Sequence, residues 1–333
     1  MATAARPLAA ARSRRIVLVV AVAALIAAGA VVGVTVLQTR GETTTVPGSV
    51  TKPRSGIPPV FFDFGVRDDP EARDLARAAE LLNAKHVAAA SAIFERHHSL
   101  QAQIGLAFAG WPGDDGLGTL KRLAAENPDS AVAEYHLGWA YLWSGRIADA
   151  AAAWNRVDTR FPDSPESVEA ENQLYSADKP DLPDLVLPLS LPGAASAAAQ
   201  LRVLAADARK PDAEAKLRYG YFLWQLWHRV SAERQFAAAA RLAPQDPYAR
   251  TAAAVGLFTK RAPARAFARL GPLTAVFPHA PVVRFELGLL LIATAQPAKG
   301  LKQLRLAAAE APRSSYAKAV RILLSRIGKH GTK

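Results

Sequence analysis

Histidine and acidic side chains are the residues of this sequence that could hold a metal ion or transfer protons. The seven histidines include no pair four residues apart, and there is no HExxH motif. His97 and His98 are adjacent, so on a helix their side chains would diverge by about 100° and would not ligate one ion together. Three acidic groups are typical of solvated helix ends and turns: Asp68-Asp69, Asp114-Asp115, and Glu166 with Glu169 and Glu171. We therefore predict no metal site.

Other catalytic patterns are also missing from the sequence. Gly110, Gly113, Gly116 and Gly118 form a glycine-rich turn, but it matches neither a phosphate-binding GxxxxGK[ST] loop nor a GxGxxG motif. There is no GxSxG elbow, and the absence of cysteine excludes disulfides, thiolate zinc sites and a cysteine nucleophile. The sequence predicts a non-enzymatic protein without catalytic residues or cofactors.

The N-terminal 37 residues have the pattern of a membrane anchor. Residues 16–37, from Ile16 to Leu37, carry no charge and would span roughly 33 Å as a helix, which is close to the thickness of the bilayer hydrocarbon. Residues 1–15 contain four arginines and no acid, which predicts a cytoplasmic N-terminus and an extracytoplasmic C-terminal domain at the cell membrane. The alternative is a cleaved signal peptide, since Ala28-Gly29-Ala30 resembles a cleavage site and Ser13-Arg14-Arg15 resembles a twin-arginine signal.

Proline and glycine predict the segments that separate the folded parts. Residues 38–59 lack a helical period and contain a threonine run followed by glycines and prolines, which is typical of a flexible linker. A second interruption carries Pro180, Pro183, Pro188 and Pro192, so we expect a proline-rich joint at residues 178–193.

A 34-residue period runs through the remainder of the chain. Pro244, Pro278 and Pro312 are separated by this step, as are Pro128 and Pro162. Three further landmarks precede each of the first three prolines at constant distances: Gly220, Ala254 and Gly288; Ala232, Ala266 and Gly300; Phe236, Leu270 and Leu304. Small residues allow two helices to approach, the larger residue fills the space between them, and proline ends the second helix. The period therefore predicts stacked pairs of antiparallel helices.

These landmarks resemble the tetratricopeptide repeat (TPR) family in its single-pass, membrane-anchored bacterial form. One copy, residues 131–164, has the landmarks Leu137, Gly138, Tyr141, Gly145, Ala150, Trp154 and Pro162, and a second begins at Ala213. The resemblance implies an all-α fold, a TPR-like α-solenoid, after one transmembrane helix. We expect an N-terminal array at residues 60–177 and a C-terminal array at residues 194–333 that ends in a basic closing helix.

The family resemblance also implies a concave groove lined by the first helix of each pair. Carried over by position, the groove residues are Tyr135, Trp139, Leu142, Trp143, Tyr221, Trp224, Phe258, Phe285, Leu289 and Ile292. An apolar or amphipathic segment of another protein could cover this aromatic surface. Two alternatives stay open: tight winding makes these residues core, or a segment of the same chain, Pro59–Val66 or Leu182–Leu191, lies on them.

The net charge of +12 is concentrated at the two ends of the chain. Residues 1–54 contribute +6 and residues 55–310 are balanced, so the other +6 belongs to the last 23 residues. These cations, candidates for an anionic lipid or cell-wall polymer, are Arg313, Lys318, Arg321, Arg326, Lys329 and Lys333. The alternative is a solvated closing helix whose C-terminal cations suit the helix dipole, and we expect no nucleic acid partner.

Together these features predict a membrane-anchored scaffold or assembly factor that binds envelope or exported proteins in its groove. The alternative is a structural tether that holds anionic wall polymer or lipid through the basic C-terminal helix.

Overall fold

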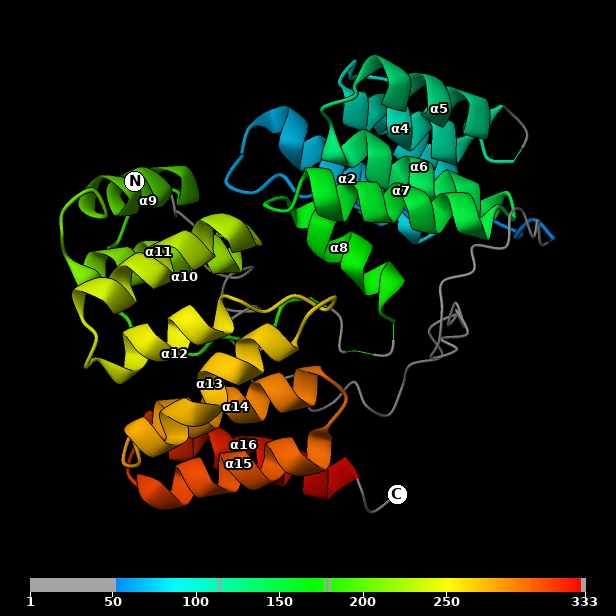
Figure 1. Ribbon diagram of the computed structural model, residues 1–333. Coiled ribbons are helices and arrows are strands. Elements are labelled where there is room, and N and C mark those ends of the chain that lie inside the picture. Colours follow the sequence, from blue (N-terminus) through cyan, green and yellow to red (C-terminus); the bar gives the residue numbers. More distant parts are fainter. Residues whose placement is uncertain (1–51, 113–114, 177, 179–180, 331–333) are drawn as a thin grey trace, which may run out of the picture. The chain divides into compact units, whose positions relative to one another are not determined.

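The computed structural model describes residues 52–330 apart from 113–114, 177 and 179–180, and the side chains up to residue 325. Every regular element in this part of the chain is a helix (Figure 1). None of these helices is long and apolar enough to cross a membrane. The predicted cytoplasmic residues 1–15 and the predicted anchor Ile16–Leu37 lie outside the described residues, as does the first part of the linker.

The described chain forms two compact units. The N-terminal unit contains residues 52–176 and 189–242, and the C-terminal unit contains residues 178–188 and 243–330. The helices of the N-terminal unit are α2 (Pro70–Asn83), α3 (Val87–Phe94), α4 (Leu100–Ala109), α5 (Gly116–Glu126), α6 (Ala131–Trp143), α7 (Ile147–Arg160), α8 (Pro165–Leu174), α9 (Ala197–Asp207), α10 (Ala213–Gln225) and α11 (Arg229–Leu242). Those of the C-terminal unit are α12 (Pro247–Val255), α13 (Ala264–Val276), α14 (Pro281–Ala293), α15 (Pro297–Glu310) and α16 (Ser315–His330).

The helix ends follow the sequence landmarks. Second helices of the pairs end two residues before the repeat prolines, for example α7 at Arg160 before Pro162 and α15 at Glu310 before Pro312. Several first helices begin after a Ser or Asp whose side chain accepts a hydrogen bond from the first turn, as Ser130 does from Ala133 N. Local sequence therefore fixes where most helices start and stop.

Small residues bring the two helices of a pair together. In α6, a Cβ atom added to Gly138 would lie 2.4 Å from Nε1 of Trp154 in α7, so only glycine leaves room for the indole. The same relation joins Gly220 of α10 to Phe236 of α11. Packing of α6 on α7, α10 on α11 and α14 on α15 repeats this arrangement (Figure 1). The predicted TPR-like all-α architecture is confirmed by these helix pairs.

The boundary between the compact units differs from the predicted boundary between arrays. Helices α9–α11, which we expected in the C-terminal array, belong to the N-terminal unit. A buried ionic cluster fastens them there: the Arg229 guanidinium of α11 lies 2.5 Å from Asp158 and 2.9 Å from Glu171. Arg229 Nε also donates to the carbonyl of Pro162. The described joint residues contain no helix.

Candidate partner-binding faces

A non-helical segment lies on the helices of the N-terminal unit. We call residues 54–66 the strap, and it joins the predicted linker to α2. Its Val60 is 5% exposed and belongs to the same hydrophobic cluster as Leu75, Leu82 and Phe94. The last part of the predicted linker, residues 54–59, is therefore docked at least in part, since Pro58 is buried and Arg54 N donates to Trp143 O at 2.8 Å.

Side chains from α2 and α6 bind the backbone of the strap. Asn83 accepts from Val60 N at 3.0 Å and donates to Val60 O at 2.8 Å, so one amide satisfies both backbone groups of that residue. The next amide, Phe61 N, donates to Nε2 of His136 at 3.2 Å. We call this set of bonds the Asn83 clamp.

The His136 bond requires a neutral imidazole in one tautomer. Nδ1 lies 2.7 Å from Val132 O and therefore carries the proton, which leaves Nε2 free to accept from Phe61. Burial lowers the pKa of His136 to about 4, although the bond to Val132 opposes that shift. At neutral pH the ring is thus an acceptor for the strap.

Aromatic rings hold the strap side chains. Phe61 stacks on Trp227, with centroids 5.9 Å apart and ring planes at 11°, and its ring meets Tyr135 nearly at a right angle. Phe62 lies against His136 at 5.2 Å and edge-on to Phe94 at 6.3 Å. Such ring pairs contribute about 0.5–1.5 kcal/mol each beyond the burial of their area.

A second non-helical segment is bound in the C-terminal unit by a different pair of side chains. We call residues 181–188 the joint segment; its Leu182, Leu185 and Leu187 are buried. Val186 N donates to Oε1 of Glu286 in α14 at 2.9 Å, and the Tyr316 hydroxyl of α16 donates to Val186 O at 3.0 Å. We call this pair the Glu286 clamp.

Glu286 is a buried acid in an apolar setting. Burial raises the pKa of Glu286 well above its ordinary range, the nearby Asp184 raises it further, and the bond from Val186 N opposes both. Its other oxygen, Oε2, has no hydrogen-bond partner in the described structure. Burial therefore favours the neutral form of the acid that binds Val186.

The structure places the ten predicted groove residues in two groups. Five are buried in the units: Tyr135, Leu142, Trp224, Phe258 and Phe285. Tyr135 meets Phe61 of the strap, a segment of the same chain, and the other four are buried in the cores of their units. The other five are half-buried: Trp139, Trp143, Tyr221, Leu289 and Ile292. Of these, Trp143 lies at the strap, where the Arg54 guanidinium sits 5.3 Å from its ring centroid.

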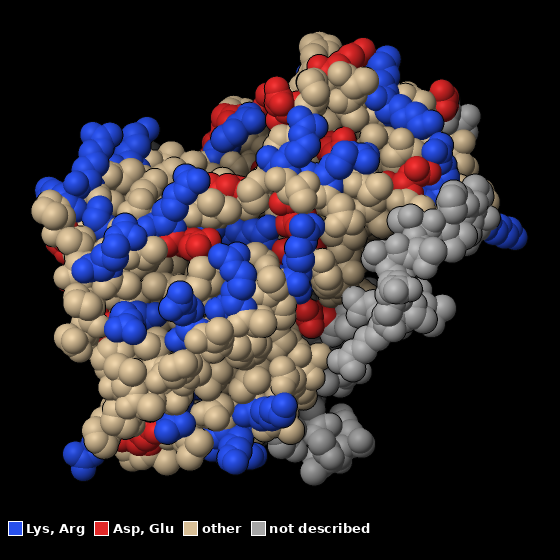
Figure 2. Space-filling view, viewed as in Figure 1, with Lys and Arg blue, Asp and Glu red and all other residues tan. Residues whose placement is uncertain are grey.

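The predicted anionic-surface residues are only partly described. Arg313, Lys318 and Arg321 are exposed, and Arg321 donates to Pro312 O at 3.1 Å. The side chains of Arg326 and Lys329, and all of Lys333, lie outside the described residues. Figure 2 shows Lys and Arg spread widely over one face, with Asp and Glu between them.

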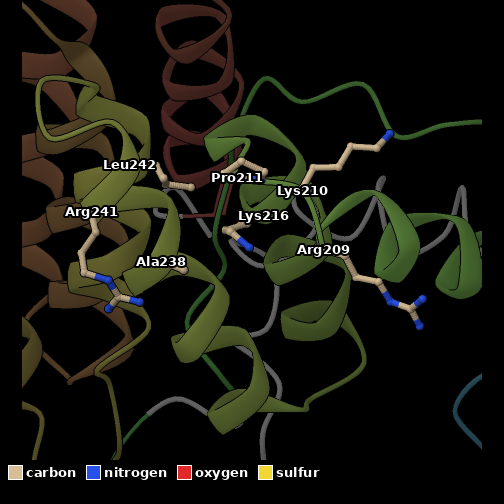
Figure 3. A pocket seen from close by; sticks show the side chains of 7 residues that line it. All are labelled: Arg209, Lys210, Pro211, Lys216, Ala238, Arg241 and Leu242. Carbon is tan, nitrogen blue, oxygen red and sulfur yellow. The ribbon is translucent and has the colours of Figure 1, made fainter.

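A basic hollow of about 370 Å³ in the N-terminal unit was not predicted from the sequence. Figure 3 shows Arg209 and Lys210 extending away from Arg241, so the four cations around it do not converge. Two of them are used locally, since Lys216 donates to Ala208 O and Lys210 pairs with Asp207. Across the described residues, no group of three His, Cys, Asp or Glu side chains is placed to hold a metal ion.

Asn83 and Glu286, the central residues of the two clamps, were also missed by sequence reasoning. Glu286 carried a signal, because it is an acid within the largely apolar stretch Val282–Ile292 of a first helix. Asn83 carried none, since an asparagine at a helix end is ordinary.

Comparisons with known proteins add little detail. No protein-family model and no curated protein matches the chain. Several solved structures are similar, and two of them are from yeast. One is the complex of the TPR2AB domain of yeast Sti1 with pHSP90, with 14% identity, a TM-score of 0.31, and coverage of 79% of this chain and 98% of that one. The other is yeast Tom70, with 10% identity, a TM-score of 0.31, and coverage of 85% of this chain and 68% of that one.

Proposed function

We propose that this protein is a membrane-anchored scaffold that binds extended segments of other proteins outside the cytoplasm. One observation carries the proposal. In both units, side chains of the helices form hydrogen bonds with the backbone of a non-helical segment, at Val60 and at Val186. Backbone reading with pockets for alternate side chains is a general way to bind peptides. The partners are envelope or exported proteins that present apolar or amphipathic segments.

The test measures how much envelope or exported protein is captured by the full chain, and compares the wild type with a variant in which a residue that contacts the strap is replaced. Trp143→Ala removes the ring on which Arg54 rests, and we expect it to reduce capture. The matched control is Tyr141→Ala, on the same helix but about 200° around its axis. Capture that is equal for both variants and the wild type contradicts the proposal.

Membrane anchoring rests on the uncharged segment Ile16–Leu37. Because the chain has no cysteine, Ser325→Cys creates a single thiol near the C-terminus. Anchoring with an extracytoplasmic domain predicts that a membrane-impermeant thiol reagent labels this residue in intact cells. Labelling only after the membrane is opened contradicts that orientation.

A second candidate is a tether that holds an anionic polymer or lipid surface. It is favoured by the exposed cations Arg313, Lys318 and Arg321, which follow the last acidic residue, Glu310. Lys318→Glu plus Arg321→Glu reverses two exposed cations but keeps Tyr316 of the Glu286 clamp, so this variant separates the two functions. Loss of capture in this variant, together with no effect of Trp143→Ala, supports the tether.

A further inference from the structure

In the middle of the strap, each backbone N–H group is either absent or bound by a side chain of the helices. Residues 58–61 read Pro-Pro-Val-Phe, so the first two have no N–H, and the next two N–H groups are those bound by Asn83 and His136. Consecutive prolines also favour an extended polyproline conformation that loses little entropy on binding. The segment therefore has the properties of a preorganised peptide ligand.

The contacts of the strap do not depend on its covalent link to the helices. A turn closed by Arg67 N to Phe64 O, with Gly65 at φ +56°, follows the bound residues and leads the chain into α2. The clamp and the ring contacts of Phe61 and Phe62 with the helices lie before this turn, as does the Arg54 contact, while Phe64 of the turn also packs on the hydrophobic cluster. A segment of another chain could make the same contacts without the turn.

Rings of the N-terminal unit define which side chains fit. Phe61 has Trp227 on one side and Tyr135 on the other, while Phe62 reaches His136 and Phe94. The site thus takes two consecutive aromatic residues. The residue before them must be small enough and apolar enough to enter the core, as the 5% exposed Val60 does.

We propose that the strap is an intramolecular ligand, and that the partner is an extended segment with prolines, one aliphatic residue and two aromatic residues, which displaces it. This inference rests on the proposed scaffold function and specifies the partner of that site. Because the strap is tethered, its effective concentration is of the order of millimolar, so a free segment competes at a disadvantage. A partner must bind with higher intrinsic affinity or offer several segments together.

The test uses a fluorescent peptide with the sequence of residues 54–66 and the full chain. In the variant Phe61→Ala plus Phe62→Ala the strap loses its rings while Asn83 and His136 remain. We expect the peptide to bind this variant at least about 10-fold more tightly than it binds the wild type. A peptide with alanine at both aromatic positions should not bind, and adding Asn83→Ala to the variant should weaken binding.

Two results overturn the inference. One is a double variant that keeps its helix content and cooperative unfolding but binds the peptide no better than the wild type. The other needs no substitution: at saturating peptide, hydrogen exchange at Val60 and Phe61 of the wild-type chain should become faster, and unchanged exchange contradicts displacement.

Peptide binding with no effect of Trp143→Ala on capture contradicts the scaffold function but not the strap inference. If Trp143→Ala abolishes capture but the peptide does not bind, the scaffold function stands and the strap inference is contradicted.

Discussion

The Asn83 clamp and the Glu286 clamp both bind the backbone of a non-helical segment, but they use different side chains. In each, one valine of a non-helical segment has both its N–H and its C=O bound by side chains of the helix pairs. One neutral amide performs both tasks in the N-terminal unit, whereas the C-terminal unit divides them between Glu286 and Tyr316. A helical array can therefore hold an extended segment without any strand, but the two clamps respond differently to pH.

Their surroundings sharpen the contrast. In the N-terminal unit, the buried Asp158 and Glu171 are neutralised by Arg229. Burial alone would lower the pKa of Arg229, but the two carboxylates raise it above its ordinary value. Glu286 of the C-terminal unit instead keeps one oxygen without a hydrogen-bond partner in the described structure. All six tryptophans belong to the N-terminal unit, so tryptophan fluorescence follows that unit alone.

The largest expected effect comes from breaking the paired charges. Arg229→Met leaves Asp158 and Glu171 buried without a cation, and we expect the free energy of unfolding to fall by about 3–5 kcal/mol. Denaturant unfolding followed by tryptophan fluorescence measures this loss. Arg234→Met, an exposed position on the same helix, is the control. Equal midpoints for the two variants would contradict the role of the cluster.

Acid should loosen the Asn83 clamp. The pKa of His136 is lowered from 6.5 to about 4 in the folded chain, so its contribution is fully present above pH 6.5 and is lost as pH falls toward 4. The loss amounts to at most about 3 kcal/mol. Tryptophan fluorescence during acid titration should report it, because Phe61 stacks on Trp227.

The control for the acid titration is a second histidine variant. His136→Gln should flatten the stability profile between pH 6.5 and 4, while His98→Gln, at an exposed position, should keep the wild-type slope. The same slope in both variants would assign the acid response to other groups.

A smaller effect is expected when the amide clamp alone is removed. Asn83→Ala leaves Val60 N and O without their partners, which costs about 1–3 kcal/mol of strap docking. The strap should then open on the order of 10–100 times more often, and chymotrypsin should cleave after Phe61 or Phe62 faster in proportion. Asn155→Ala, at an exposed position on α7, should leave the cleavage rate unchanged.

The smallest effect at acidic pH is expected from Glu286→Gln. The glutamine oxygen can still accept from Val186 N, so below the ordinary glutamate pKa the two proteins should differ by less than about 1 kcal/mol. Because the folded pKa of Glu286 is raised, the stability it contributes is lost as pH rises through that value, and the wild type should fall below the variant. Circular dichroism follows unfolding of both units, whereas tryptophan fluorescence follows the N-terminal unit alone. A transition seen only by circular dichroism therefore belongs to the C-terminal unit. A constant difference at all pH values would contradict this account.

The helix pairs could be predicted from the sequence because their signals are local. Proline after α7, α11 and α15, and glycine opposite a large residue, such as Gly138 opposite Trp154, state where helices end and touch. Sequence reasoning also offered Pro59–Val66 and Leu182–Leu191 as segments that could occupy the groove surface. The strap contacts the predicted groove residues Tyr135 and Trp143, whereas the joint segment is bound by Glu286 and Tyr316, which were not among them.

The clamps and the unit boundary could not be predicted because they depend on contacts between distant residues. Asn83 and Val60 are 23 residues apart, Glu286 and Val186 are 100 apart, and Arg229 and Asp158 are 71 apart. No local sequence pattern indicates which distant residues will form such pairs. For Tyr135, Trp224 and the other buried members of the predicted groove the sequence left burial and partner binding as alternatives, since the position within a repeat does not say what covers it.

Two non-helical segments are bound through their backbones by side chains of the helices. Amide hydrogen exchange of the full wild-type chain tests this binding most directly, with the exposed Ser55 and Gly56 as an internal reference. We predict that the amides of Val60, Phe61 and Val186 exchange orders of magnitude more slowly than this reference, once intrinsic rates are corrected. Exchange of these three amides at the reference rate would contradict the account.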